Sequence, residues 1–197
     1  KFYIFNREWL LDFFRRLRKL LPECLMLGGG PEFLGDNADF FNSTSPLDLV
    51  VRGEGEIAFA ELLRNIEDRA TWPAIAGLCG MANGSYFDAG TAKLPDITAL
   101  PQPYMRNMPG FNKPFLLMET ARGCMNQCAF CASAGTGPLR ALRIEQVRRE
   151  LHTIADAGIR EVRLADRTFN EQPERCRMFL ELFRTEFPEI RFHLEIE

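Results

Sequence analysis

The chain has 197 residues, of which 46% are hydrophobic and 26% charged, as is typical of a globular protein with one domain or two small ones. Its formal net charge of −3 gives no electrostatic reason to expect a nucleic-acid partner. No stretch approaches the roughly 20 consecutive apolar residues that a membrane-spanning helix needs, so no membrane span is expected.

The first part of the chain alternates between strand and helix patterns. The predicted elements are a strand at 2–5, a helix at 7–21, a strand at 24–27, a strand at 48–51 and a helix at 56–66. Strands alternating with helices predict right-handed βαβ units and a parallel sheet. We therefore expect residues 1–68 to form part of a Rossmann-type domain.

The basic, amphipathic segment 7–21 has a second interpretation, as a transit peptide or a membrane-surface helix. Glu8 and Asp12, together with the strand patterns on both sides, favour a helix that packs within the fold. Its predicted buried face carries Leu10, Phe13, Phe14, Leu17, Leu20 and Leu21.

Residues 69–112 have a different composition. They are rich in proline and glycine, which predicts an irregular linker and a domain boundary. A small hairpin around Asn83 and Gly84 is compatible with this interpretation.

A second βαβ series begins after the linker. It comprises a strand at 115–120, a helix at 143–156 with Gly158 as its C-terminal cap, a strand at 160–166, a helix at 174–187 and a strand at 190–197. Cys176, Phe179, Leu180, Phe183 and Phe187 form the predicted buried face of the last helix. Three parallel strands leave an open apolar edge, so we expect the chain to be a fragment of a longer protein.

Three of the six cysteines, Cys124, Cys128 and Cys131, lie within eight residues. This clustering favours a metal site in a reducing compartment, hence a cytoplasmic protein, over a secreted disulfide scaffold. Thiolates suit iron–sulfur clusters and zinc. Three cysteines leave one iron of a 4Fe–4S cluster open, whereas structural zinc sites and electron-transfer ferredoxins usually have four ligands.

Residues 118–131 read METARGCMNQCAFC, which resembles the cluster loop of radical S-adenosylmethionine enzymes. The family implies a partial (β/α)6 barrel, of which residues 113–197 would be the N-terminal half. It also implies that Cys124, Cys128 and Cys131 hold a 4Fe–4S cluster whose open iron binds S-adenosylmethionine, giving a 5′-deoxyadenosyl radical. Phe130 occupies the aromatic, cofactor-binding position of that pattern.

Further stretches resemble the subgroup with an appended cobalamin-binding domain. They are ADRTFN at 165–170, VVRGEGE at 50–56 and GGPE at 29–32. The resemblance implies that Gly29 and Gly30 line the pocket for the cobalamin tail; the alternative is a tight turn that needs positive φ. The chain has no Asp-x-His-x-x-Gly stretch, so a histidine ligand to cobalt is not supported and cobalamin binding stays open.

Two carboxylates are further cofactor-binding candidates. Asp166 ends the strand at 160–166, where it could accept a hydrogen bond from the cofactor's amino group. Alternatively, it caps the next turn or pairs with Arg167. Glu195 shares one face of the last strand with His193 and Glu197, and it either contacts the cofactor or lies exposed.

The main hypothesis is a radical enzyme of the methyl-transfer or cyclisation class. It would act on an unidentified small molecule or peptide and take electrons from a flavodoxin or ferredoxin. The alternative is a non-catalytic iron–sulfur or zinc-binding interaction module.

Overall fold

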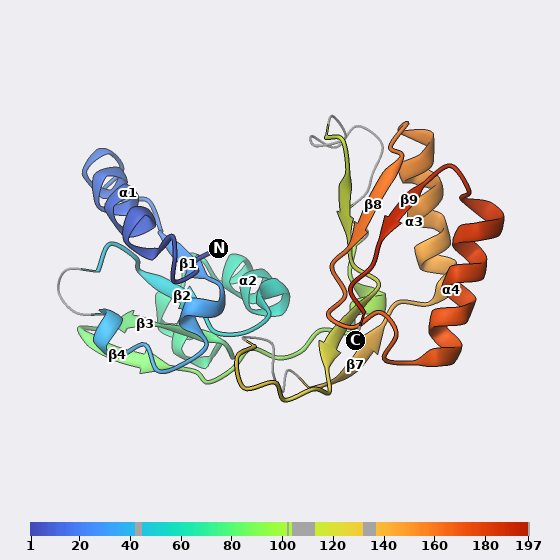
Figure 1. Ribbon diagram of the computed structural model, residues 1–197. Coiled ribbons are helices and arrows are strands. Elements are labelled where there is room, and N and C mark those ends of the chain that lie inside the picture. Colours follow the sequence, from blue (N-terminus) through green and yellow to red (C-terminus); the bar gives the residue numbers. More distant parts are fainter. Residues whose placement is uncertain (42–44, 102, 104–112, 132–136, 197) are drawn as a thin grey trace. The chain divides into compact units, whose positions relative to one another are not determined.

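Figure 1 shows the computed structural model, which describes residues 1–41, 45–101, 103, 113–131 and 137–196. The chain divides into two compact units, Lys1–Pro95 and Asp96–Glu197. The mixed α/β fold with parallel strand pairs that the sequence predicts is confirmed in both units.

In the described part of the first unit, one four-stranded sheet has the order β1-β2-β3-β4. Strands β1 (Leu27–Gly29) and β2 (Leu49–Val51) are parallel, as in a Rossmann-type unit. Helix α2 (Gly55–Arg64) follows β2, at nearly the predicted position.

The other two strands lie within the segment predicted to be a linker. Strands β3 (Leu78–Ala82) and β4 (Ser85–Asp88) form an antiparallel hairpin, and β3 also pairs antiparallel with β2. The hairpin turns at Asn83 and Gly84, both with positive φ, as such turns require. Residues 69–95 therefore belong to the first unit, whereas residues 102 and 104–112 of the predicted linker lie outside the described residues.

The predicted strand at residues 2–5 is wrong. Residues 4–6 form a turn, in which the Asn6 side chain accepts a hydrogen bond from the Tyr3 backbone N–H at 2.8 Å. The Phe2 N–H donates to the Gly29 carbonyl at 2.8 Å, and its side chain is buried. The apolar run at 2–5 therefore buries one anchor residue, while Ile4 and Phe5 stay exposed.

Helix α1 (Arg7–Leu20) confirms the predicted helix but buries a narrower face than predicted. Leu11 is buried, and Leu10, Phe14 and Leu17 pack against the same cluster. Phe13, Leu20 and Leu21 are exposed, although the helical pattern assigned them to the buried face.

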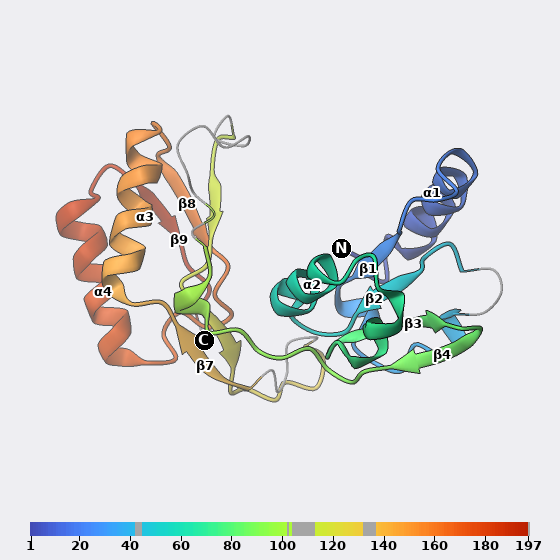
Figure 2. The same cartoon turned by 180° about the vertical axis from the view of Figure 1, so that it is seen from behind.

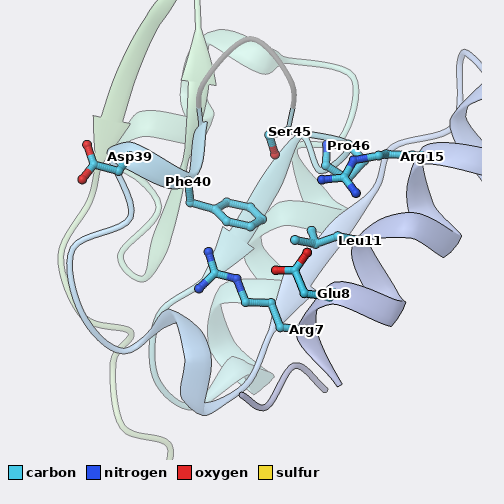
Figure 3. A pocket seen from close by; sticks show the side chains of 8 residues that line it. All are labelled: Arg7, Glu8, Leu11, Arg15, Asp39, Phe40, Ser45 and Pro46. Carbon is cyan, nitrogen blue, oxygen red and sulfur yellow. The ribbon is translucent and has the colours of Figure 1, made fainter. Parts of the chain in front are cut away.

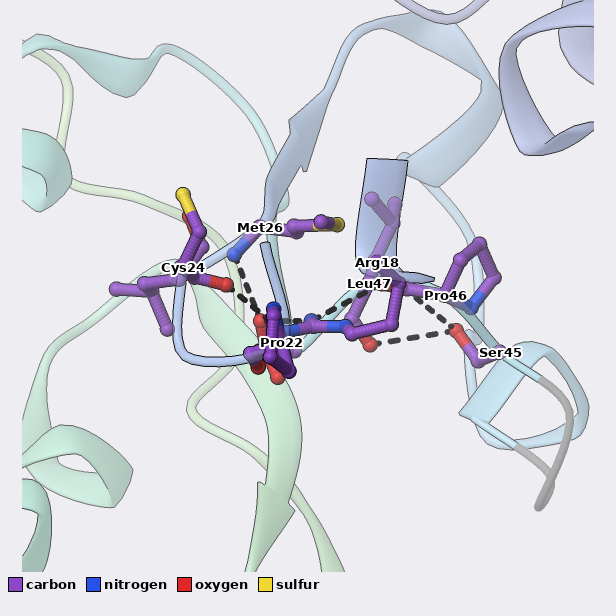
Figure 4. A network of polar contacts seen from close by, with 9 residues as sticks. Arg18, Pro22, Cys24, Met26, Ser45, Pro46 and Leu47 are labelled. Carbon is purple, nitrogen blue, oxygen red and sulfur yellow. Dashed lines mark hydrogen bonds and ion pairs between the residues drawn. The ribbon is translucent and has the colours of Figure 1, made fainter. Parts of the chain in front are cut away.

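Arg18 fixes the end of α1 to the starts of both parallel strands (Figure 4). Its guanidinium donates to the carbonyls of Pro22, Cys24 and Pro46 at 3.0, 2.8 and 3.2 Å. It also donates to the Asp48 carboxylate at 2.5 Å, and that carboxylate accepts from the Met26 N–H at 2.7 Å. One side chain thereby satisfies carbonyls that would otherwise need water.

The two tryptophans of the chain both lie in the first unit. Trp72, in the 3-10 helix Arg69–Ala74, is 4% exposed and packs with Leu49, Leu62 and Leu78. Its indole N–H donates to the Asn65 carbonyl at 3.1 Å. Trp9 on α1 is 69% exposed and stacks on Phe13.

The described part of the second unit contains a parallel three-stranded sheet of order β5-β8-β9. The strands are β5 (Leu116–Met118), β8 (Glu161–Leu164) and β9 (Arg191–His193), and helices α3 (Ile144–Asp156) and α4 (Pro173–Glu186) cover one face (Figure 2). Gly158, with φ of 82°, follows α3 as predicted.

The core of this unit lies between the sheet and its two helices. It includes Met118, Val147, Leu151, Val162 and Phe179. On α4, Leu182 is buried and Leu180 is exposed, so the prediction for Leu180 is wrong, and Cys176 is only partly buried. Leu180 and Leu182 are two residues apart, which is about 200° around an α-helix, so they lie on nearly opposite faces.

In the part of the chain that the structure describes, no helix combines the length and apolar character needed to cross a membrane.

Candidate functional site

The cysteine loop leaves the sheet of the second unit directly after β5. A turn at Glu119 and Thr120 leads into β6 (Ala121–Cys124), which pairs antiparallel with β7 (Gly137–Ala141). The register shifts between Arg122 and Cys124, where Gly123 has φ of 102°. This β6–β7 hairpin presents the loop at the carboxyl end of a parallel strand, where ligand sites gather in α/β folds.

The three clustered cysteines all lie in the described residues and carry thiols. Cys124 ends β6 and is 8% exposed, whereas Cys128 and Cys131 are exposed on the loop. The Cys131 N–H donates to the Cys128 carbonyl at 3.0 Å, which closes a tight turn between them.

The donor set fits an iron–sulfur cluster chemically, because three thiols are the soft ligands that such clusters use. Among the residues whose placement is described, no three His, Cys, Asp or Glu side chains converge closely enough to hold one metal ion. A 4Fe–4S cluster does not need such convergence, since each cysteine binds a different iron.

Asp166 lies just beyond β8 and is 1% exposed. Its carboxylate accepts from the Thr120 N–H at 2.7 Å, the Ala121 N–H at 3.1 Å and the Thr120 hydroxyl. Arg175 completes the set with an ion pair of 3.6 Å. Within the described residues, Asp166 thus pairs with Arg175 and not with Arg167. The contact with the cofactor's amino group stays a prediction.

Arg175 was not predicted as a site residue. Its guanidinium donates to the Thr120 carbonyl at 3.0 Å and to the Thr120 hydroxyl, and it lies 4.5 Å from the centre of the Phe179 ring. Burial lowers the pKa of this guanidinium, and the Asp166 carboxylate opposes that shift. Removing one partner of such a buried pair typically costs about 3–5 kcal/mol.

The sequence held one signal for Arg175. A basic residue in the first turn of a helix faces the positive end of the helix dipole, which is unfavourable without a compensating acid. Its position in the first turn of the helix predicted at 174–187 therefore indicated an acidic partner outside the helix.

Thr168 brings a further polar group to the cysteine loop. It is buried, and its hydroxyl oxygen lies 3.9 Å from the Cys124 sulfur. Both Asp166 and Thr168, from the segment after β8, thus contact residues of the β5–β6 connection and β6.

The other predicted cofactor contacts of the second unit are solvent-accessible. Phe130 is 93% exposed on the cysteine loop. Glu195 follows β9 and is exposed, while its backbone carbonyl accepts from the Phe169 N–H at 2.8 Å. Glu197 lies outside the described residues.

Gly29 and Gly30 end and follow β1 in the first unit. Gly30 has φ of 127°, and a Cβ there would lie 2.5 Å from the Phe2 carbonyl oxygen. The tight-turn interpretation thus accounts for Gly30, because the Phe2 backbone occupies that space. A Cβ on Gly29 would make only ordinary van der Waals contact with Val51, at 4.0 Å, so the tight-turn interpretation does not account for this glycine.

The first unit also contains a cavity of about 180 Å³ between the start of α1 and the residue pairs 39–40 and 45–46 (Figure 3). Its lining is mixed in charge, with Arg7, Glu8, Arg15 and Asp39 around Leu11 and Phe40. Arg7 pairs with Glu32 at 2.7 Å. None of the site residues predicted from the sequence lines this cavity.

Fold and site together define an α/β chain with a Rossmann-like unit, followed by a parallel-sheet unit that carries three thiols on its first strand-end loop. No family model matches the sequence. The cobalamin-dependent radical SAM methyltransferase TokK of Streptomyces tokunonensis is 27% identical over 185 residues, which cover 87% of this chain and 27% of TokK.

Two solved structures share the fold. The cobalamin-dependent S-adenosylmethionine radical enzyme OxsB, with aqua-cobalamin and S-adenosylmethionine bound, matches 95% of this chain and 28% of its own, with a TM-score of 0.75 and 20% identity. The second structure is the radical S-adenosylmethionine methyltransferase TsrM of Kitasatospora setae, with cobalamin and a [4Fe-4S] cluster bound. It has a TM-score of 0.68 and 17% sequence identity, and the match covers 93% of this chain and 40% of TsrM. The predicted resemblance is confirmed: the chain is homologous to cobalamin-dependent radical SAM enzymes and spans part of their length.

Proposed function

We propose that this chain belongs to a cobalamin-dependent radical S-adenosylmethionine enzyme, in which Cys124, Cys128 and Cys131 hold a 4Fe–4S cluster. The observation that carries this proposal is the position of three thiols on the loop after β5, at the carboxyl end of a parallel sheet. TokK, OxsB and TsrM, which are similar over most of this chain, are all radical S-adenosylmethionine enzymes by description.

The chain's residues would contribute binding and orientation, since cofactors of this type carry the reaction itself. When bound, the cluster and S-adenosylmethionine together supply a 5′-deoxyadenosyl radical. Exposed Phe130 would offer its ring face to the cofactor, and exposed Glu195 would accept hydrogen bonds from ribose hydroxyls.

The first unit would contribute to cobalamin binding. Gly29 lies at the end of a parallel strand, where a nucleotide tail could approach a backbone without a side chain closely. Gly30 would act indirectly, by allowing the Phe2 segment to pack against the turn.

The proposed reaction is methyl transfer to a small molecule or peptide, because both TokK and TsrM are described as methyltransferases. A flavodoxin or ferredoxin would supply electrons. Action in the cytoplasm is proposed because a cluster of three cysteines suits a reducing compartment.

Anaerobic reconstitution of the intact natural protein tests the proposal. We expect about four irons per chain, as a 4Fe–4S cluster requires, and formation of 5′-deoxyadenosine from S-adenosylmethionine under reducing conditions. Single alanine substitutions of Cys124, Cys128 and Cys131 should abolish both. Cys24→Ala and Cys176→Ala are matched controls and should leave iron content unchanged.

The products separate the proposed reaction from its alternatives. Methyl transfer leaves S-adenosylhomocysteine, whereas cyclisation without methyl transfer gives 5′-deoxyadenosine but no S-adenosylhomocysteine. A single tightly bound zinc ion with no cofactor cleavage would instead identify a non-catalytic binding module and refute the proposal.

A further inference from the structure

Thr120 is the point at which four elements of the second unit meet. Its N–H and hydroxyl donate to Asp166 after β8, and its carbonyl accepts from Arg175 on α4 at 3.0 Å. The same carbonyl accepts from the N–H of Leu142, just after β7, at 2.8 Å. Thr120, Asp166 and Arg175 are named the Asp166 clamp below.

The clamp is shielded from solvent. Thr120 is fully buried, and the Asp166 and Arg175 side chains are 2% and 11% exposed. Two backbone amides, one hydroxyl and one guanidinium surround the carboxylate, so its acceptor positions are largely occupied within the protein. A carboxylate with these partners has little remaining capacity for a ligand.

The position of the clamp connects it to the cysteine loop. Thr120 lies four residues before Cys124, and Ala121, which also donates to Asp166, is the first residue of β6. The contact between Thr120 and Leu142 fixes the end of β7 as well. Both arms of the β6–β7 hairpin that frames the loop are thereby held at one buried point.

The position of Arg175 is unfavourable for the stability of α4 itself. Arg175 occupies the first turn of α4, where a cation opposes the helix dipole. Its burial also costs solvation energy, which the Asp166 carboxylate and the Phe179 ring offset. The described contacts that offset this cost are those with Thr120, Asp166 and Phe179.

We propose that Asp166 is a positioning residue, which acts through Thr120 to set where Cys124 lies relative to the end of the parallel sheet. This inference rests on the proposed function, since it concerns the thiol that would hold the first iron. It replaces direct contact between Asp166 and S-adenosylmethionine with an indirect role in cluster geometry.

The test uses the intact protein and compares Asp166→Asn and Thr120→Val with Thr120→Ser, which keeps the hydroxyl. Asp48→Asn is the matched control, because Asp48 also joins an arginine to a backbone N–H but lies in the first unit. Thr120→Val preserves side-chain shape, so it remains informative where Asp166→Asn folds poorly.

The first readout needs no cluster. In metal-free protein, the alkylation rate of Cys124 should rise about tenfold or more in Asp166→Asn and Thr120→Val, since losing a buried partner promotes local opening. In Thr120→Ser and Asp48→Asn, the alkylation rate of Cys124 should equal that of the wild type. The alkylation rate of exposed Cys24 should be the same in all variants.

The second readout is the electron paramagnetic resonance spectrum of the reduced cluster without S-adenosylmethionine. If Asp166 positions Cys124, the spectrum should be broadened or shifted in Asp166→Asn and Thr120→Val. The spectrum of Thr120→Ser should equal that of the wild type. An unchanged spectrum combined with weaker S-adenosylmethionine binding in Asp166→Asn would make Asp166 a cofactor ligand and overturn the inference. Wild-type protein that takes up no iron would refute the proposed function instead.

Discussion

Gly123 shows how one backbone conformation shapes the loop that carries the three thiols. Its φ of 102° lies in the region that favours glycine, and it coincides with the register shift one residue before Cys124. The shift lets β6 bend where it becomes the cysteine loop, as β-bulges do elsewhere. The conformation of Gly123 thus contributes to the direction in which the loop leaves the hairpin.

The first prediction concerns Gly123→Ala. A side chain at this φ should destabilise the native backbone by about 1–2 kcal/mol and shift the loop. We expect less iron per chain after reconstitution, measured by colorimetric iron assay. Gly158→Ala is the control, because Gly158 also has positive φ but follows α3 in open space. Equal iron loss in both variants would contradict a local role.

Cys79 differs chemically from the cysteines of the loop. It is fully buried on β3, and its thiol donates to the Asp88 carboxylate at 3.2 Å. Burial, followed by the hydrogen bond to Asp88, raises its pKa to about 11. Since the thiolate is the reactive form, Cys79 is suited to a structural role.

The second prediction follows from this raised pKa. At pH 8, Cys79 should be alkylated far more slowly than exposed Cys128 in native, metal-free protein, as peptide mass spectrometry can measure. Asp88→Asn removes the neighbouring negative charge and should increase the Cys79 rate. If Cys79 and Cys128 reacted at similar rates, the buried environment of Cys79 would be disproved.

At the scale of elements, the β3–β4 hairpin is joined to the parallel part of its sheet by charge as well as by strand pairing. Arg52, directly after β2, donates to Asp88 on β4 at 2.6 Å. Burial disfavours ionisation of Asp88, but the Cys79 thiol, the Gly90 N–H and Arg52 outweigh it and lower its pKa. The ionised carboxylate is therefore part of the folded hairpin.

The third prediction is a pH dependence. Because the pKa of Asp88 is lower in the folded state, its contribution to stability is present above the unfolded pKa of about 3.9 and is lost as pH falls through the folded pKa. Asp88→Asn should cost about 1 kcal/mol or less at pH 7, measured by urea unfolding. The difference from wild type should shrink towards pH 3; a constant difference would contradict the assignment.

Helices were predictable because their signals are local. The 3.6-residue periodicity, Pro22 and Pro188 identified α1, α3 and α4 to within about two residues of their observed ends. The apolar run at residues 2–5 carried no such local information, because its conformation depends on the distant Gly29 backbone. Tertiary contacts therefore determined what the sequence pattern could not.

The candidate site divides in the same way. Residue type, spacing and the family resemblance were enough to predict Cys124, Cys128 and Cys131 as cluster ligands, and this assignment stays a prediction. The partners of Asp166 are Thr120 and Arg175, which are 46 and 9 residues away, and no periodicity connects these positions. A buried carboxylate could be recognised as needing donors, but the donors themselves required the fold.

At the scale of the whole molecule, each unit has its own buried clusters. Leu151, Val162 and Phe179 belong to the core of the second unit, whereas Leu49 and Leu62 belong to the first. The division of the chain at residues 95 and 96 thus separates the hydrophobic clusters as well. A cavity made in one core should therefore lower the packing energy of that unit only.

The fourth prediction uses this separation. Leu151→Ala should cost about 2–5 kcal/mol, because it leaves a cavity in a fully buried position. Amide hydrogen exchange should lose protection in β5, β8 and α3 but not in β2 or α2. Leu62→Ala is the reciprocal variant in the first unit. Loss of protection throughout the chain in either variant would show that the two units unfold as one.

Trp9 and Trp72 lie on the same side of that division, one exposed and one buried. The tryptophan fluorescence of this chain therefore reports on residues 1–95 alone. Its blue-shifted component comes from buried Trp72 and its red-shifted component from exposed Trp9. Acrylamide should quench the Trp9 component first. Unfolding of the second unit alone would leave the tryptophan emission unchanged. Calorimetry or circular dichroism is therefore required to observe the unfolding of that unit.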